Sequence, residues 1–172
     1  NGVVAHRPLV MVSNRGPVQF TQERNGHFST KQGSGGLVTA VSTVLQENEA
    51  VWIAATMGRG DRARWQRARD NNEAFIPPAE SGTNFHLRFV EPDEAAYNKY
   101  YNVISNPLLW FLQHYLWDTP RAPDITHEVW DAWRNGYVTV NQQFANEIVA
   151  ACDHLADRGE PIVMLQDYHL YL

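Results

Sequence analysis

Cysteine is scarce in this sequence, whose 172 residues include one, Cys152. One cysteine excludes a disulfide framework within the chain and fits a reducing, cytoplasmic compartment. Apolar runs are short, because none approaches the roughly 18 consecutive residues of a membrane-spanning helix, and we expect no membrane partner. Positive charge is also in deficit, with 14 Lys and Arg against 19 Asp and Glu and a net charge of -5. This balance argues against nucleic acid as a partner.

Hydrophobic and aromatic residues, in contrast, are plentiful. They make up 44% and 12% of the chain, and the aromatic residues include six Trp. The length suits one domain, and the composition is sufficient for a real core. We therefore expect one domain over residues 1–172, with most aromatic rings in its core.

The most informative stretch is a short apolar run at residues 9–12 that leads directly into Ser13, Asn14 and Arg15. Such a run, bounded by turn residues, is typical of a strand buried on both faces, as in a parallel sheet. Ligands of open α/β sheets bind outside the carboxyl ends of the strands. Arg15 is therefore a candidate clamp for a phosphate or carboxylate, because its planar guanidinium donates two hydrogen bonds at once. The structural alternative is a strand-end arginine paired with a nearby acid.

A glycine-rich turn at residues 33–36 opens a helical pattern at 37–45. The free backbone N–H groups of such a turn, including those of Gly35 and Gly36, would suit an anion. The alternative, which this motif by itself favours, is a tight turn before a helix. The turn is a poor dinucleotide fingerprint, since Val38 occupies the position of the third glycine.

Hydrophobic periodicity predicts alternating strands and helices along the rest of the chain. The predicted β elements are strands at residues 51–55, 85–90 and 162–165 and a hairpin around Asn25-Gly26. The predicted helices are a charged, exposed one over 61–70, one over 94–101, one that restarts at Asn106-Pro107, and a long one, capped by Thr126, whose apolar stripe runs from Trp130 to Leu155. This alternation predicts an α/β fold with a mostly parallel, Rossmann-like sheet flanked by helices.

A second polar cluster, at residues 166–170, follows the predicted last strand. If the sheet is parallel, Asp167 in this cluster lies on the same edge as Arg15. A carboxylate and a guanidinium facing one crevice would suit a phosphorylated ligand that carries hydroxyl groups. The structural alternatives are that Asp167 caps a helix N-terminus and that His169 is a packed, hydrogen-bonded imidazole. No metal-ligand spacing surrounds His169, and we predict no metal site.

Five short motifs occur in a fixed order along the chain. They are Val12-Ser13-Asn14-Arg15, Gly35-Gly36-Leu37, Tyr100-Tyr101-Asn102 with Ser105-Asn106, Leu109-Trp110 and His114-Tyr115, Val140-Asn141 with Phe144-Ala145, and Gln166-Asp167-Tyr168-His169-Leu170. Together they resemble the trehalose-6-phosphate synthases, retaining glycosyltransferases of family 20 with two Rossmann-like domains facing a cleft. The resemblance covers nearly the whole chain. It implies the N-terminal domain of a glycosyltransferase-B fold.

The resemblance also implies a reaction and its partners. Such enzymes transfer glucose from a nucleotide sugar to glucose 6-phosphate, with retention at the anomeric carbon, in trehalose biosynthesis. The N-terminal half holds the acceptor, glucose 6-phosphate, and the donor is a nucleotide-glucose. No cofactor is implied, and homo-oligomer formation is left open. Positioned dipoles and charges, rather than a covalent nucleophile, carry chemistry of this kind.

Roles for particular residues follow from the same resemblance. Arg15 would grip the acceptor phosphate, and Tyr101 and Trp110 would line the same pocket. Asp167 would hydrogen-bond acceptor hydroxyl groups. Phenol and indole groups can donate to phosphate oxygens, but core packing is the alternative for both aromatic residues. In the glycine turn, Gly36 and its neighbour Gly35 would approach the diphosphate or glucose of the donor.

Three departures from the family pattern bear on function. The family's second strand commonly carries Trp-x-Gly-Trp, where this chain has Trp52-Ile53-Ala54-Ala55, and residues 61–70 resemble an insertion. Both leave open a related transferase with another acceptor, in glucosylglycerol phosphate or pseudo-sugar synthesis. The chain also ends at Leu172, before the family's catalytic histidine and its donor-binding domain. We therefore expect an incomplete, acceptor-side domain that is inactive alone.

Two rivals come from other classes of protein. One is a non-catalytic module that binds a sugar phosphate without a donor half. The other is a Rossmann dehydrogenase, which the missing third glycine disfavours. The absence of an acidic residue at the end of the second predicted strand also argues against a dehydrogenase.

Overall fold

The computed structural model describes residues 7–33, 50–117 and 122–172. The chain divides into two compact units. Unit 1 comprises Asn1–Glu91 and Asn146–Gln166, and unit 2 comprises Pro92–Ala145 and Asp167–Leu172. Unit 1 is built on a sheet, whereas the described elements of unit 2 are helical. One domain over residues 1–172 stays a prediction.

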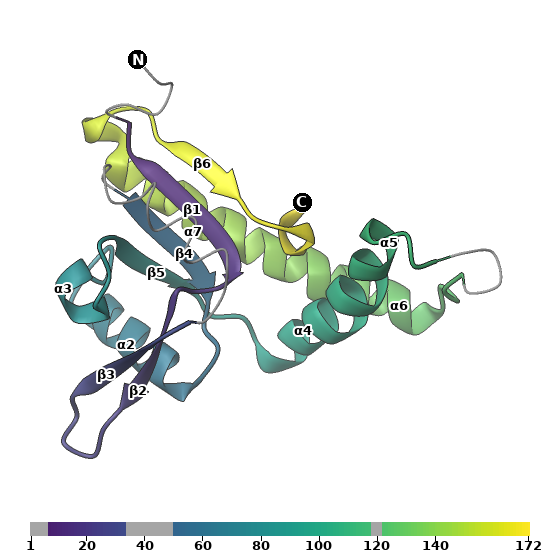
Figure 1. Ribbon diagram of the computed structural model, residues 1–172, viewed down its shortest axis with the longest axis horizontal. Coiled ribbons are helices and arrows are strands. Elements are labelled where there is room, and N and C mark those ends of the chain that lie inside the picture. Colours follow the sequence, from purple (N-terminus) through teal and green to yellow (C-terminus); the bar gives the residue numbers. More distant parts are fainter. Residues whose placement is uncertain (1–6, 34–49, 118–121) are drawn as a thin grey trace. The chain divides into compact units, whose positions relative to one another are not determined.

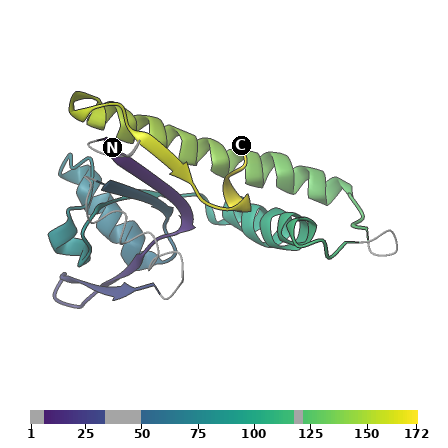
Figure 2. The same cartoon turned by 45° about the horizontal axis from the view of Figure 1, so that its top comes forward.

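Unit 1 contains a four-stranded parallel sheet with the strand order β5-β4-β1-β6. Its strands are β1 (Leu9–Arg15), β4 (Ala50–Ala55), β5 (His86–Val90) and β6 (Ile162–Leu165). Figures 1 and 2 show β1 between its neighbours β4 and β6. The predicted α/β class and parallel sheet are confirmed. β1 continues past the apolar run that predicted it, through Ser13, Asn14 and Arg15.

The two faces of the sheet are covered by different elements, which explains why β1 and β4 are buried nearly throughout. One face packs against the helix α2 (Arg59–Asp70) and a β-hairpin. The cluster formed there comprises Leu9, Met11, Val18, Phe20, Ala50, Trp52, Ala54, Trp65, Ala68, Ile76, Phe85, Leu87 and Phe89. On the other face, Arg88 pairs with Glu147 of the long helix α7 (Thr139–Leu155).

The predicted hairpin is confirmed. β2 (Val18–Gln22) pairs antiparallel with β3 (Phe28–Gln32). Gly26 in the connecting turn has φ 82°, a left-handed conformation that glycine adopts without strain. Val18 and Phe20 direct their side chains into the apolar cluster, whereas Gln19 and Thr21 are exposed. The alternating pattern of the sequence thus corresponds to one buried and one solvated face.

α2 corrects the prediction of a fully solvated, charged helix. Its residues Asp61 and Arg64 are buried. Arg64 Nη2 donates to Glu80 at 2.8 Å and to Glu73 at 3.3 Å, and Glu80 lies on the short helix α3 (Pro78–Ser81). Carboxylates from outside the helix allow this charge to be buried. Periodicity within the helix carries no information about such partners.

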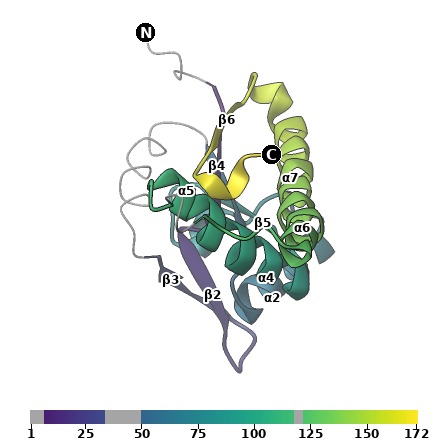
Figure 3. The ribbon, with the colours of Figure 1, turned by 90° about the vertical axis from the view of Figure 1, so that its right-hand side faces the viewer.

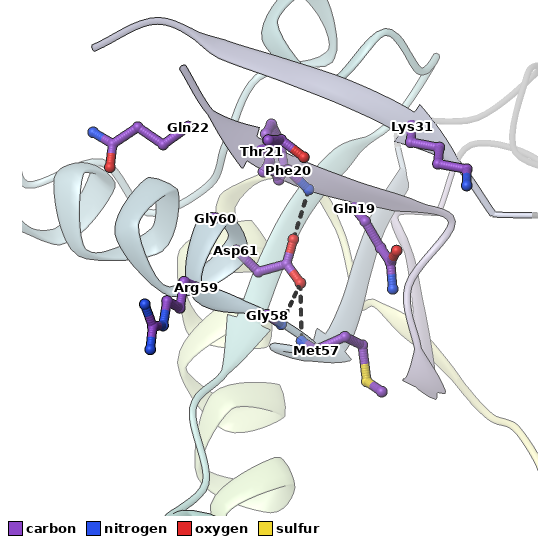
Figure 4. A pocket seen from close by; sticks show the side chains of 10 residues that line it. All are labelled: Gln19, Phe20, Thr21, Gln22, Lys31, Met57, Gly58, Arg59, Gly60 and Asp61. Atoms are coloured by element: carbon purple, nitrogen blue, oxygen red, sulfur yellow. Dashed lines mark hydrogen bonds between the residues drawn. The ribbon is translucent and has the colours of Figure 1, made fainter. Parts of the chain in front are cut away.

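Asp61 ties the start of α2 to the hairpin (Figure 4). Its carboxylate accepts hydrogen bonds from the backbone N–H groups of Phe20 at 2.7 Å, Met57 at 2.9 Å and Gly58 at 3.1 Å. Burial raises the pKa of Asp61, and the three N–H donors oppose that shift. The approach is close, because a Cβ atom at Gly60 would overlap the carbonyl group of Phe20. A glycine is therefore required at this position.

Unit 2 consists mainly of two helical runs. Its elements are α4 (Glu94–Asn98), η1 (Lys99–Trp110) and α5 (Phe111–Gln113) in the first run, α6 (His127–Ala132), η3 (Trp133–Val138) and the beginning of α7 in the second, and the short η5 (Tyr168–Leu170). Figures 2 and 3 show the two runs packed along each other. Both η1 and η3 are π-helical.

The predicted restart at Asn106-Pro107 is wrong, because η1 continues through Pro107. Proline lacks an N–H group and clashes with the preceding turn of an α-helix. In η1 the hydrogen bonds span five residues, and the wider turn accommodates the proline ring. Buried residues recur at Ala96, Tyr100 and Ile104, and Pro107 lies on the exposed side. The run can therefore continue without a cap at Asn106.

The long helical run after Thr126 is confirmed, with two corrections. Within the described chain, the Thr126 side chain makes no capping hydrogen bond to α6. Trp130, predicted to lie in the apolar stripe, is 52% exposed, whereas Tyr137 and Phe144 are buried. The wider turns of η3 change the angular spacing of residues. Positions before it therefore do not share a face with positions after it.

Candidate functional site

Arg15 ends β1 at the carboxyl edge of the sheet in unit 1. Its side chain is exposed, whereas Ser13 and Asn14 immediately before it are buried. β6 ends at the same edge, where the Gln166 amide donates to the carbonyl oxygen of Val12 at 2.9 Å. An exposed guanidinium at this edge lies where parallel α/β sheets bind ligands.

A buried hydrogen-bond chain adjoins Arg15. Trp52 Nε1–H, on β4, donates to Ser13 Oγ at 2.7 Å, and Ser13 Oγ donates to the backbone carbonyl oxygen of Arg15 at 2.7 Å. These linked hydrogen bonds were not predicted from the sequence. The available signal was the position of Ser13. It follows the apolar run and lies two residues after Met11, so it shares the strand face that meets the core.

Asp167 is the first residue of unit 2 after β6. It has φ 76° and ψ 167°, a region that is almost restricted to glycine. Its Oδ1 accepts from the backbone N–H of Tyr168 at 2.7 Å, and its Oδ2 lies 3.7 Å from His169 Nδ1. The side chain remains 52% exposed. Asp167 therefore caps η5, as the structural alternative predicted, and also presents a carboxylate oxygen to solvent.

Aromatic stacking surrounds His169. The ring of Tyr101 stacks on the imidazole with 5.6 Å between centroids and 12° between planes. Tyr97 in turn stacks on Tyr101, with 5.7 Å between ring centroids. His169 itself is buried, as the packed-imidazole alternative predicted. Tyr101 and Asp167 are thus brought together, because both contact the same histidine.

Hydrogen bonds from the helices fix η5 in place. Tyr137 Oη donates to the carbonyl oxygen of Tyr168 at 2.6 Å and accepts from the Tyr171 N–H at 3.2 Å. Asn141 Nδ2 donates to the carbonyl oxygen of His169 at 3.1 Å. Tyr137 and Asn141 were not predicted as supporting residues. Their sequence signals were the position of Tyr137 in the predicted apolar stripe and that of Asn141 in the Val140-Asn141 motif.

Burial favours the protonated form of three phenols of this region, those of Tyr100, Tyr137 and Tyr168. Burial raises the pKa of Tyr168 to about 12, with a smaller contribution from the Asp167 charge. Burial also raises the pKa of Tyr137, and it raises that of Tyr100 most strongly. Tyr168 Oη accordingly donates to Asn106 Oδ1 at 3.0 Å. These groups serve as fixed dipoles rather than as proton carriers.

Trp110 lies at the end of η1, nine residues after Tyr101. Nine residues span about two and a half turns of an α-helix but about two turns of a π-helix. The π-helical winding therefore brings the two side chains close to one face of a continuous segment. The Trp110 ring stacks on His114 at 4.2 Å and meets Phe111 edge-on at 5.1 Å.

The remaining predicted residues, Gly35 and Gly36, lie outside the described part of the chain, as does the predicted helix at 37–45. Within residues 7–33, 50–117 and 122–172, no group of His, Cys, Asp and Glu side chains could hold a metal ion. In the same ranges, no helix has the length and apolarity needed to cross a membrane.

The parallel sheet, its helices on both faces and the polar residues at the end of β1 and after β6 define a Rossmann-like α/β protein. The sequence matches Glycosyltransferase family 20 over residues 7–172, and the chain belongs to this family.

Curated relatives agree with this assignment. The chain is 33% identical over 165 residues to "Alpha,alpha-trehalose-phosphate synthase [UDP-forming] A" of Dictyostelium discoideum, covering 95% of this chain and 19% of the relative. It is 32% identical over 164 residues to "Trehalose-6-phosphate synthase" of Mycolicibacterium smegmatis, covering 95% and 27%. The chain thus spans less than a third of the length of these relatives.

A solved structure from E. coli, described as trehalose-6-phosphate bound with UDP-2-fluoro glucose, has the same fold. It superposes with a TM-score of 0.55 at 21% identity, covering 95% of this chain and 28% of that chain. This match supports the predicted glycosyltransferase-B architecture of the N-terminal region.

Proposed function

We propose that this chain is the acceptor-binding part of a glycosyltransferase that transfers glucose from a nucleotide sugar to glucose 6-phosphate, with retention, in trehalose biosynthesis. Membership of Glycosyltransferase family 20 supports the reaction class. The names of the relatives support the product, and one of these names specifies a UDP-forming reaction. A solved structure of the same fold is described with UDP-2-fluoro glucose, which supports a nucleotide-glucose donor.

The observation that carries the proposal is the exposed guanidinium of Arg15 at the end of a strand that is otherwise buried. The core residues of β1 precede Arg15, which lies at the carboxyl edge of the sheet. A guanidinium donates two parallel hydrogen bonds to a phosphate, and such charge-assisted bonds are stronger than neutral ones. We assign Arg15 to the acceptor phosphate.

The other roles are assigned from the side chains of unit 2 and from the resemblance. Asp167 keeps an exposed carboxylate oxygen, which can accept hydrogen bonds from sugar hydroxyl groups. Tyr101 and Trp110 are assigned to line the same acceptor pocket, where a phenol and an indole N–H can donate to phosphate oxygens. Gly35 and Gly36 are assigned to the donor diphosphate or glucose from the resemblance alone.

The test compares two ligands and two arginines in the protein at its natural length. Substitution R15A should weaken glucose 6-phosphate binding by about 100-fold, since a charge-assisted pair is worth about 2–3 kcal/mol. Glucose binding should change little. The control is R24A, which removes an exposed arginine near the hairpin turn and should leave both affinities unchanged. Isothermal titration with each ligand supplies the measurement.

Equal losses for glucose and glucose 6-phosphate in R15A would remove Arg15 from phosphate recognition. A panel of phosphorylated acceptors, with glycerol 3-phosphate included, tests the acceptor assignment. If another acceptor supports faster transfer from a nucleotide-glucose than glucose 6-phosphate does, the related-transferase alternative replaces the proposal. Tight sugar-phosphate binding without any transfer would favour the non-catalytic module.

A further inference from the structure

β1 and β4 change register near the carboxyl ends of the two strands. Ser13 lies opposite Ala54, but Arg15 lies opposite Ala55, so that Asn14 is an additional residue in β1. An additional residue on one strand is the register of a β-bulge, which is uncommon in a parallel pair, and we refer to this shift as the bulge. Bulges next to functional sites redirect a side chain.

The bulge determines which face of the sheet Arg15 occupies. Side chains alternate along a strand, so in a regular β1 Arg15 would share the face of Met11 and Ser13, which meets the apolar cluster. A shift of one residue moves a side chain to the opposite face. With the bulge, Arg15 takes the face of its partner Ala55, and its side chain is exposed.

The hydrogen-bond chain from Trp52 spans this bulge. The Trp52 indole is fully buried and tilted against Phe85, with 5.4 Å between ring centroids, which limits its movement. Its N–H donates to the Ser13 hydroxyl at 2.7 Å, and that hydroxyl donates across the bulge to the Arg15 carbonyl oxygen at 2.7 Å. Each polar group in this apolar surrounding is thus satisfied by the next, and losing one leaves the others unpaired.

We infer that Ser13 and Trp52 are positioning residues for phosphate recognition, because their hydrogen bonds hold the bulge that presents Arg15. The inference rests on the proposed role of Arg15. Neither side chain is assigned a contact with the ligand. Their effect is to keep the Arg15 backbone in the one register that leaves its guanidinium accessible. Loss of either side chain should therefore lower the affinity for a ligand that carries a phosphate. The affinity for an unphosphorylated sugar should not change.

The experiment compares S13A with S81A in the protein at its natural length. Ser81 is a matched control, since it is also buried and its hydroxyl contacts the Pro78 carbonyl oxygen at 3.2 Å and Thr83 Oγ1 at 2.6 Å, away from β1. Substitution S13A should weaken glucose 6-phosphate binding by about tenfold and leave glucose binding within about twofold. Substitution S81A should change neither affinity, although both variants lower the melting temperature.

Two further variants test the hydrogen bonds that link Trp52, Ser13 and Arg15. One removes the Trp52 donor, and the other keeps a hydroxyl at position 13. Substitution W52F removes the indole N–H and should reproduce the ligand selectivity of S13A, whereas S13T keeps the hydroxyl and should restore glucose 6-phosphate affinity. In the double variant S13A/R15A, the loss should not exceed that of R15A, because both act through the guanidinium. If R15A discriminates the two ligands but S13A does not, the positioning role is wrong and the proposed function stands. If R15A does not discriminate them, the role of Arg15 itself is wrong.

Discussion

Unit 1 and unit 2 position their exposed polar groups by different means. In unit 1, the backbone register of a parallel sheet determines where Arg15 lies. In unit 2, side chains hold in place the segment that follows Asp167. Tyr137 and Asn141 hydrogen-bond the backbone of η5, and Tyr101 stacks on His169. The first mechanism depends on a β-bulge, an interruption of strand alternation that the hydrogen bonds from Trp52 to Ser13 and from Ser13 to Arg15 span. The second requires particular side chains to meet across separate helices.

This difference has a consequence for how each unit responds to substitution. A parallel ladder distributes its hydrogen bonds over many backbone groups, so that most of its strand pairing does not depend on the hydrogen bonds of any one side chain. A short segment such as η5 has few backbone bonds of its own. Loss of one supporting side chain should therefore release it locally. The comparison can be tested with substitutions at one supporting residue in each unit.

Asp61 is a place outside the bulge where unit 1 depends on a single side chain in the manner of unit 2. Substitution D61A should lower the free energy of unfolding by about 3 kcal/mol, because it leaves three backbone N–H donors without their acceptor. Chemical denaturation supplies the measurement. The control D70A, at the exposed end of the same helix, should change stability by less than about 0.5 kcal/mol.

A small effect of D61A would mean that the apolar cluster alone holds the hairpin against α2. The distinction between the units would then become sharper, since apolar packing rather than a polar side chain would hold the hairpin of unit 1. Hydrogen exchange separates the two cases, because the amide of Phe20 should lose protection in D61A only if the carboxylate is its essential partner.

Tyr137 tests the corresponding dependence in unit 2. Substitution Y137F keeps the ring and removes a hydroxyl that bonds the Tyr168 carbonyl oxygen and the Tyr171 amide. The expected loss is about 2 kcal/mol, and hydrogen exchange at Tyr171 should accelerate. Substitution Y115F, at an exposed tyrosine, is the matched control. Unchanged exchange at Tyr171 in Y137F would contradict the view that side chains hold η5.

The same contrast explains which features could be predicted from the sequence. The strands at 9–12 and 51–55 and the hairpin around Asn25-Gly26 were recognisable, because a buried strand and an Asn-Gly turn each have a local composition. The positions of Arg15 at the end of β1 and of Asp167 after β6 were also recognisable, whereas their roles in binding stay predictions. These features depend on neighbours within a few residues.

The features that could not be predicted depend on distant partners. The burial of Arg64 requires Glu80 on another helix, and the hydrogen bond from Trp52 to Ser13 joins residues on different strands. Continuation of η1 through Pro107 requires a change of helical winding, which periodicity for an α-helix cannot represent. In each case the sequence shows the residue but gives no signal for the contact that determines its environment.

Substitutions at Asp167 give the smallest expected difference in stability, and we expect the usual order of glycine and alanine to be reversed there. Glycine usually destabilises a protein relative to alanine, because it loses more conformational freedom on folding. At φ 76° and ψ 167° the order should invert, and D167G should be more stable than D167A by about 1 kcal/mol, since only glycine adopts this conformation without strain. Both variants lose the carboxylate and should bind the acceptor weakly.

At Asp157, in the short helix η4 (Ala156–Arg158), the usual order should hold, with alanine the more stable. The usual order at both positions, measured by thermal unfolding, would mean that the backbone of Asp167 is not strained. Asp167 would then be held by its capping hydrogen bond to the Tyr168 N–H alone.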